Sequence, residues 1–159
     1  MRIVIVEDSP LLRDNLIRLF ADHPELSVLG SAAGEDAAVA LIAAQRPDTV
    51  LLDLSLSQGS GLGVLRRLRA TPGLAPRVLV LSSRPADPWE ALCLDAGADA
   101  FLDKAGDPSV LLAQLASWMP PLPLDQLRRR RRLQQLQVLD TRAEPALDAA
   151  HLQSLLRER

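Results

Sequence analysis

The sequence predicts an α/β fold, a doubly wound five-stranded parallel sheet followed by a C-terminal helical extension. Three observations favour it. Short runs of valine, leucine and isoleucine alternate five times with segments of helical periodicity over residues 1–118. No tight hairpin turn separates two of these runs, so crossover helices must connect parallel strands. The runs are apolar on both faces, which is typical of strands that helices cover on both sides.

The five expected strands are short, and polar or turn residues bound each of them. In chain order they are RIVIV at 2–6, ELSVLGSA at 25–32, TVLLD at 49–53, RVLVLSS at 77–83 and DAFLDK at 99–104. In open parallel sheets, ligands bind beyond the carboxyl ends of the strands. The residues that directly follow each run are therefore the first candidates for a functional site.

Five segments of helical periodicity follow these strands. The first has Asp8 and Ser9 as candidate N-caps, and Pro10 suits a first helical turn. The fourth ends at Gly97, a common C-terminal signal. The expected helices cover residues 10–20, 34–45, 61–70, 87–98 and 107–118. Apolar residues recur at helical spacing in the first of them, at Leu11, Leu12, Leu16, Leu19 and Phe20.

Composition excludes several classes of protein. With 159 residues, of which 48% are hydrophobic, the chain can bury a core of its own. No apolar run approaches the length of about 18 residues that a membrane span needs, so no membrane partner is expected. The N-terminus lacks the long apolar stretch of a secretory signal. The single cysteine, Cys93, excludes an internal disulfide and a cysteine-based metal cluster. We expect a soluble, cytoplasmic protein.

Chemically reactive side chains gather at the predicted strand ends. Glu7 and Asp8 follow the first strand, Asp53 ends the third, Ser82 lies at the end of the fourth and Lys104 ends the fifth. Three neighbouring carboxylates repel one another, and a hard cation such as Mg²⁺ relieves that repulsion. A metal, an ammonium and a hydroxyl around one carboxylate can stabilise phosphoryl transfer to it. Taken singly, each residue also fits an ordinary turn, cap or solvated role.

Lys104 is the only lysine in the chain, against seventeen arginines. A strong compositional bias toward arginine could leave one lysine by chance. The alternative is that this position needs a compact ammonium on a flexible stem, which the planar guanidinium fork does not imitate. We favour the second interpretation, because Lys104 falls at a strand end beside the other polar candidates.

The order of these strand-end residues on a five-fold β/α chain resembles the receiver domain of two-component response regulators. Two further features match: Gly61 lies eight residues after Asp53, and an aromatic residue, Phe101, lies three residues before Lys104. The resemblance covers residues 1 to about 118. It implies a flavodoxin-like receiver fold with strand order 2-1-3-4-5.

The resemblance also implies a role for each residue of the site. Asp53 would accept the phosphoryl group, and Lys104 would bridge the phosphate and the acidic pocket. Glu7 and Asp8 would organise Mg²⁺ together with Asp53, with Asp8 the preferred direct ligand. The backbone carbonyl of Ser55 would complete the metal site.

A second group of implied roles concerns switching. Ser82 would be the switch hydroxyl that turns toward the phosphate, and Phe101 the switch aromatic. Trp89 and Phe101 would lie on the output face formed by the fourth helix, the fifth strand and the fifth helix. Packing in the core or at its edge is the alternative for Trp89.

The function implied is that of a response regulator that takes a phosphoryl group from a histidine kinase or phosphotransfer protein. It would depend on Mg²⁺ and would not be an enzyme, apart from slow hydrolysis of its own aspartyl phosphate. One rival is an aspartate-nucleophile phosphatase. Such enzymes place a nucleophilic aspartate and a second aspartate two residues later after strand one, whereas here Glu7 and Asp8 are adjacent. A nucleotide-binding protein is disfavoured, because no glycine-rich strand–helix turn occurs.

The C-terminal part differs from the rest in charge. Residues 1–120 carry fifteen acids and ten bases, whereas residues 121–159 carry five acids and eight bases. Three prolines within 120–123 predict a semi-rigid linker. We therefore divide the chain into a receiver domain at 1–119, a linker at 120–123 and a helical extension at 124–159, with a last helix at about 145–158.

Three roles remain open for this extension. Two short helices bury little surface alone, so docking or dimerisation comes first, through the extension or through the helix-four to helix-five face. A solvated surface without a ligand comes second. Nucleic-acid binding by a DNA-binding regulator comes third, because consecutive arginines spread around a helix and the extension has no aromatic residue for stacking. The basic patch concerned consists of Arg128, Arg129, Arg130, Arg131 and Arg132.

Overall fold

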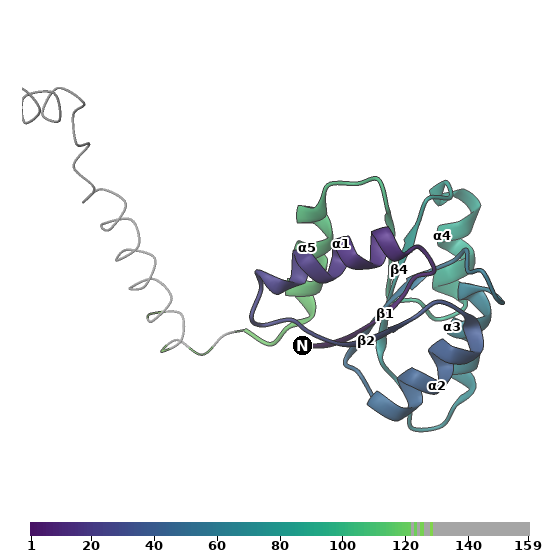
Figure 1. The fold of residues 1–159 in the computed structure, drawn as a ribbon, viewed down its shortest axis with the longest axis horizontal. Helices are drawn as coiled ribbons and strands as arrows, with labels where there is room; N and C mark the ends of the chain where they lie inside the picture. The colour runs from purple at the N-terminus through teal and green to yellow at the C-terminus, as the bar shows by residue number, and fades with distance from the viewer. Residues whose placement is uncertain (122, 124, 126–127, 129–159) are drawn as a thin grey trace, which may run out of the picture. The chain divides into compact units, whose positions relative to one another are not determined.

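The computed structural model describes residues 1–121, 123, 125 and 128, and shows a twisted parallel sheet with helices on both faces (Figure 1). The five strands lie in the order β2-β1-β3-β4-β5, and every neighbouring pair is parallel. The predicted doubly wound fold and its strand order are therefore confirmed. The strands are β1 (Arg2–Val6), β2 (Ser27–Ala32), β3 (Thr49–Asp53), β4 (Arg77–Ser82) and β5 (Ala100–Asp103).

The helices divide between the two faces of the sheet. Helices α1 and α5 cover one face, and α2, α3 and α4 cover the other (Figure 1). This division follows from right-handed crossovers on either side of β1. The helices are α1 (Pro10–Ala21), α2 (Glu35–Gln45), α3 (Gly61–Ala70), α4 (Ala86–Asp95) and α5 (Pro108–Trp118).

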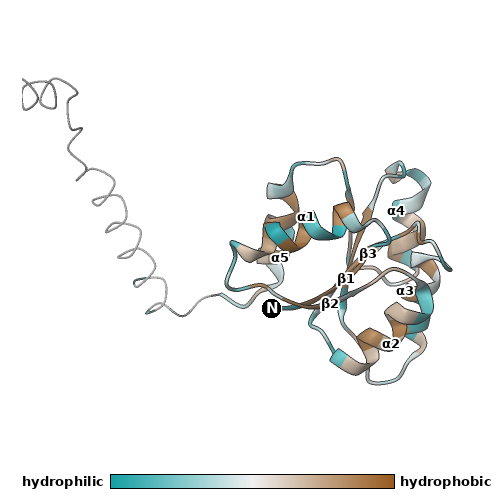
Figure 2. Cartoon of the chain, viewed as in Figure 1, coloured by the Kyte–Doolittle hydropathy of each residue, from teal (hydrophilic) through white to brown (hydrophobic). Residues whose placement is uncertain are grey.

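Two hydrophobic clusters, one on each face, hold these layers together. Successive strand residues point to opposite faces, so Ile3 and Ile5 join the cluster under α1 and α5, whereas Val4 and Val6 join the one under α2, α3 and α4. All four residues are buried. Figure 2 shows the resulting hydrophobic colouring along the central strands. The apolar runs therefore read as continuous because both faces are covered.

Local turns and caps explain where the observed helices and strands begin and end. Ser9 is the N-cap of α1, and its hydroxyl accepts a hydrogen bond of 3.4 Å from the Leu12 amide. Helix α4 ends at Asp95, two residues before Gly97, which adopts a φ of +101° that favours glycine. Strand β2 starts at Ser27 rather than at residue 25, because Leu26 closes a turn onto the His23 carbonyl.

Helix α1 buries only part of its apolar stripe. Phe20 is buried, and Leu16 and Leu19 pack against the same cluster. Leu11, by contrast, is 70% exposed, and Leu12 also lies at the surface. The helical spacing of these leucines predicted the helix correctly, but it did not predict which of them would face the sheet.

Residues 1–119 form a compact unit separate from the rest of the chain. The predicted helical extension lies outside the described residues, apart from single positions that include Arg128. Among the described residues, no helix has the length and apolar character needed to cross a bilayer.

Candidate functional site

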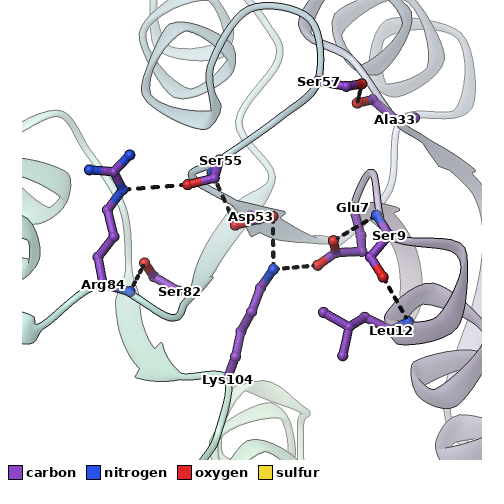
Figure 3. A network of polar contacts seen from close by, with 10 residues as sticks. All are labelled: Glu7, Ser9, Leu12, Ala33, Asp53, Ser55, Ser57, Ser82, Arg84 and Lys104. Carbon is purple, nitrogen blue, oxygen red and sulfur yellow. Dashed lines mark hydrogen bonds and ion pairs between the residues drawn. The ribbon is translucent and has the colours of Figure 1, made fainter.

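Four predicted site residues converge at the carboxyl edge of the sheet (Figure 3). Glu7 directly follows β1, Asp53 is the last residue of β3, Ser82 is the last residue of β4, and Lys104 directly follows β5. These four strands are consecutive in the sheet, so their ends lie next to one another. The connecting segments that follow them hold the polar side chains where the chain leaves the hydrophobic layers.

The ammonium group of Lys104 lies between two carboxylates. Its Nζ is 2.6 Å from Oε2 of Glu7 and 2.7 Å from Oδ2 of Asp53. The side chains of Lys104, Glu7 and Asp53 are only 15%, 4% and 6% exposed. In such a site the two ion pairs are screened much less than pairs at a protein surface. One positive charge thus faces two nearly buried negative charges.

Burial and charge act against each other on the pKa values of this cluster. Burial raises the pKa of Glu7 above its usual value, although hydrogen bonds from Lys104 and from the Ser9 amide lower it in part. For Lys104, burial lowers the pKa, but hydrogen bonds to Asp53 and Glu7 outweigh it and leave the pKa raised. The lysine is therefore firmly protonated, whereas Glu7 ionises less readily than an exposed glutamate.

Backbone groups orient the two carboxylates. The Ser9 amide donates to Oε1 of Glu7 at 3.0 Å, and the Ser55 amide donates to Oδ1 of Asp53 at 3.1 Å. Gly61 lets α3 start close to the end of β3, because a Cβ at this position would clash with the Asp53 carbonyl oxygen. A glycine is required there for steric reasons, whatever the site does.

The site has the donor set that a hard cation prefers. Carboxylate oxygens of Glu7, Asp8 and Asp53 all lie within 4.8 Å of one another. Asp8 is half-buried, whereas Glu7 and Asp53 are buried. Three clustered carboxylate oxygens fit Mg²⁺, which binds through a few carboxylates and retains several waters. The contribution of the Ser55 carbonyl stays a prediction.

The two switch candidates lie on neighbouring strands. Ser82 is 1% exposed, and its hydroxyl accepts a hydrogen bond of 3.0 Å from the Arg84 amide. The Lys104 amide donates to the Ser82 carbonyl, so the backbone already links the ends of β4 and β5. Phe101 and Trp89 are partly buried against the cluster under α2, α3 and α4. Their roles in switching and output stay predictions.

One residue at this edge was missed by the sequence analysis. Nε of Arg84 lies 3.4 Å from the hydroxyl of Ser55, and its guanidinium carbon lies 4.4 Å from the centre of the Trp89 ring. Its place two residues after Ser82, beyond the end of β4, was the available signal. Of the tail basic patch, only Arg128 is described, and it belongs to the separate C-terminal unit.

Comparison with known proteins gives a family match over most of the chain. The family of response regulator receiver domains matches residues 3–116. The nitrate/nitrite response regulator NarP of Escherichia coli K12 is 34% identical over 111 residues, which cover 70% of this chain and 51% of NarP. The chain spans about half the length of the curated relatives it matches.

Solved structures agree with this match. A two-component response regulator of the LuxR family from Aurantimonas sp. SI85-9A1 is 29% identical with a TM-score of 0.69, covering 73% of this chain and 82% of that one. The BeF₃-activated N-terminal receiver domain of RstA from Klebsiella pneumoniae is 32% identical with a TM-score of 0.67, covering 73% and 96%. Both similarities cover nearly three-quarters of this chain.

Proposed function

Since the chain belongs to the response regulator receiver family, we propose that it accepts a phosphoryl group on Asp53 from a histidine kinase or a phosphotransfer protein. The observation that carries the proposal is the buried pair of carboxylates, Glu7 and Asp53, held by the single ammonium of Lys104. An ion pair that only stabilises the surface does not require two buried carboxylates around one ammonium. A carboxylate that accepts a phosphoryl group gains negative charge, and cations already in position stabilise that charge.

The proposed reaction uses each of these groups. A carboxylate oxygen of Asp53 attacks phosphorus, the bond from phosphorus to the donor nitrogen breaks, and the donor imidazole keeps that electron pair. Asp8, Glu7 and Asp53 would hold Mg²⁺, which would supply positive charge to offset the negative charge of the incoming phosphoryl group. Lys104 then exchanges its Asp53 oxygen for a phosphoryl oxygen. Ser82 rotates its hydroxyl away from the Arg84 amide and donates to a second phosphoryl oxygen.

Output proceeds by contact with another protein or by dimerisation. Ser82 ends β4, and the segment after it leads into α4, so a turn of Ser82 toward the site moves the start of that helix. Trp89 on α4 and Phe101 on β5 both pack against the cluster under these elements. A shift in their packing would alter the face formed by α4, β5 and α5. The sequence of the C-terminal extension leaves it open as a second docking or dimerisation element.

A DNA-binding regulator is the second candidate. It is favoured by the similarity to a LuxR-family response regulator and by the basic patch at residues 128–132. A shift of duplex DNA that weakens with salt and is lost when these five arginines are changed to glutamine would support it. A phosphatase is disfavoured, because Asp53 is followed by Leu54 and Ser55 rather than by a second aspartate.

The test uses the full chain with acetyl phosphate and Mg²⁺. Intact mass should show one added phosphoryl group, and EDTA should prevent it. Asp53→Asn should abolish the labelling, whereas Asp99→Asn, at the opposite edge of the sheet, should label like the parent. Sedimentation of the labelled and unlabelled chains then tests dimerisation. Labelling of Asp53→Asn to the parental extent, or no labelling of the parent, would overturn the proposal.

A further inference from the structure

Arg84 connects two parts of the molecule that the proposed reaction leaves separate. Its Nε points to the Ser55 hydroxyl at 3.4 Å, and its guanidinium lies over the Trp89 ring at 4.4 Å (Figure 3 shows the first contact). Ser55 in turn donates its amide to Asp53 at 3.1 Å. The arginine thus reaches from the first turn of α4 to the rim of the acidic site.

Both contacts of the Arg84 guanidinium are weak and exchangeable. A distance of 3.4 Å is long for a hydrogen bond, and a stacked guanidinium at an exposed position gains little from the ring. In the part of the chain that the structure describes, no carboxylate forms an ion pair with Arg84. Its charge is therefore available to a stronger partner.

Phosphorylation would supply that partner. A phosphoryl group replaces the single negative charge of Asp53 with roughly two and adds acceptor oxygens directed out of the site. Lys104 already serves Glu7 as well as Asp53. A guanidinium fork matches phosphoryl oxygens in a bidentate geometry, which a ring face cannot equal.

We propose that Arg84 is a second phosphoryl-binding cation, which stacks on Trp89 while Asp53 is unmodified and leaves the ring to bind the phosphoryl group. The inference rests on the proposed function of Asp53. It adds a route from the site to α4 that runs through the Arg84 side chain and Trp89, beside the one through Ser82 and Phe101. Release of the guanidinium exposes one face of Trp89, which then becomes available on the output face.

The experiment follows the ring by fluorescence. The chain has two tryptophans, so Trp118→Phe leaves Trp89 as the single reporter. Beryllofluoride with Mg²⁺, a stable mimic of the phosphoryl group, is titrated into the full chain, and emission and acrylamide quenching of Trp89 are recorded. The parent should show a saturable change, with more quenching in the bound state.

Arg84→Met removes the charge and keeps a flexible stem. It should give high quenching before any ligand is added, lose most of the change, and bind beryllofluoride roughly tenfold more weakly, as expected for one lost charge-assisted contact. Arg84→Lys should recover part of the affinity without the bidentate fork. Arg66→Met, which removes the same charge from α3, is the matched control and should behave like the parent.

The outcomes separate the inference from the proposed function. Calorimetry records beryllofluoride binding independently of fluorescence. If the parent binds and Arg84→Met shows the same affinity and the same Trp89 response, the inference is wrong and the proposed function stands. If the parent shows no binding by calorimetry, the proposed function fails and the inference fails with it.

Discussion

Two charged clusters lie at opposite ends of the strands, one at the carboxyl edge of the sheet and one at the amino edge, and their architectures differ. At the carboxyl edge, Lys104 faces Glu7 and Asp53 in a nearly buried setting. At the amino edge, Arg69 of α3 pairs with Asp99, and these side chains are 28% and 38% exposed. Both clusters join elements that are distant in the sequence, yet they use different cations.

The amino-edge cluster is saturated with hydrogen bonds. Arg69 donates from Nε and Nη2 to the Gly97 carbonyl at 2.9 and 2.7 Å, and from Nη1 to the Pro76 carbonyl at 2.9 Å. Asp99 accepts from the Val78 amide at 2.7 Å as well as from Arg69. The guanidinium fork fits several fixed acceptors at once, which suits a permanent structural connection.

The carboxyl-edge cluster is short of positive charge. A single ammonium serves two carboxylates, and Asp8 adds a third within 4.8 Å of them. A compact ammonium can move between oxygens as the partners change. The difference teaches that this chain uses an arginine where several fixed acceptors surround the cation, and its one lysine where a compact cation lies between two buried carboxylates.

The largest effect is expected for Lys104→Met. Removing one partner of a buried ion pair leaves uncompensated charge, so the free energy of unfolding should fall by about 3 kcal/mol in EDTA. Mg²⁺ should restore part of the loss, because it can neutralise the same carboxylates. Urea unfolding of this variant, with Arg66→Met as control, measures both. A change under about 0.5 kcal/mol, the range of ordinary surface substitutions, would contradict the charge deficit.

The reciprocal swaps Arg69→Lys and Lys104→Arg sharpen the comparison. Arg69→Lys loses most of the bonds to Gly97 and Pro76 and should lower stability by about 1–2 kcal/mol, at about 1 kcal/mol for each lost bond, without affecting labelling of Asp53. Lys104→Arg should keep the charge and impair the response to acetyl phosphate. If Lys104→Arg responded like the parent, the solitary lysine would reflect composition alone. Unfolding curves and intact mass of both variants give the answer.

The smallest effect concerns pH. Because burial raises the pKa of Glu7 above 4.5, the folded chain binds this proton more tightly than the unfolded chain. The contribution of Glu7 to stability therefore falls as pH rises from 4.5 through the folded pKa. Glu7→Gln removes this dependence on pH. The stability of the variant relative to the parent should therefore increase across that window, by at most about 1.4 kcal/mol per pH unit, and then level off.

Urea unfolding of both chains as a function of pH measures this difference. Lys104 does not interfere, because its raised pKa keeps it charged until the pH exceeds 10.5. If the stability of Glu7→Gln relative to the parent stays flat or declines with rising pH, the pKa of Glu7 is not raised.

The sequence allowed prediction of those site residues that lie directly at the ends of strands. Asp53 and Lys104 could be assigned to one edge because parallel strands end there together. Arg84 could not be selected, since its contact with Trp89 depends on how α4 is placed after β4. The Arg69–Asp99 pair was likewise hidden, because it joins residues thirty positions apart on elements without a shared pattern.

The pattern of apolar runs was enough to establish the five β/α units, their parallel connection and the edge where the acids and the lysine gather. It could do so because hydrophobic periodicity and crossover handedness act locally along the chain. Folding in three dimensions settled the 2.6 and 2.7 Å contacts of Lys104, the exposure of Leu11 and the stacking of Arg84. Those features depend on strand register and helix placement, which arise only when distant segments pack together.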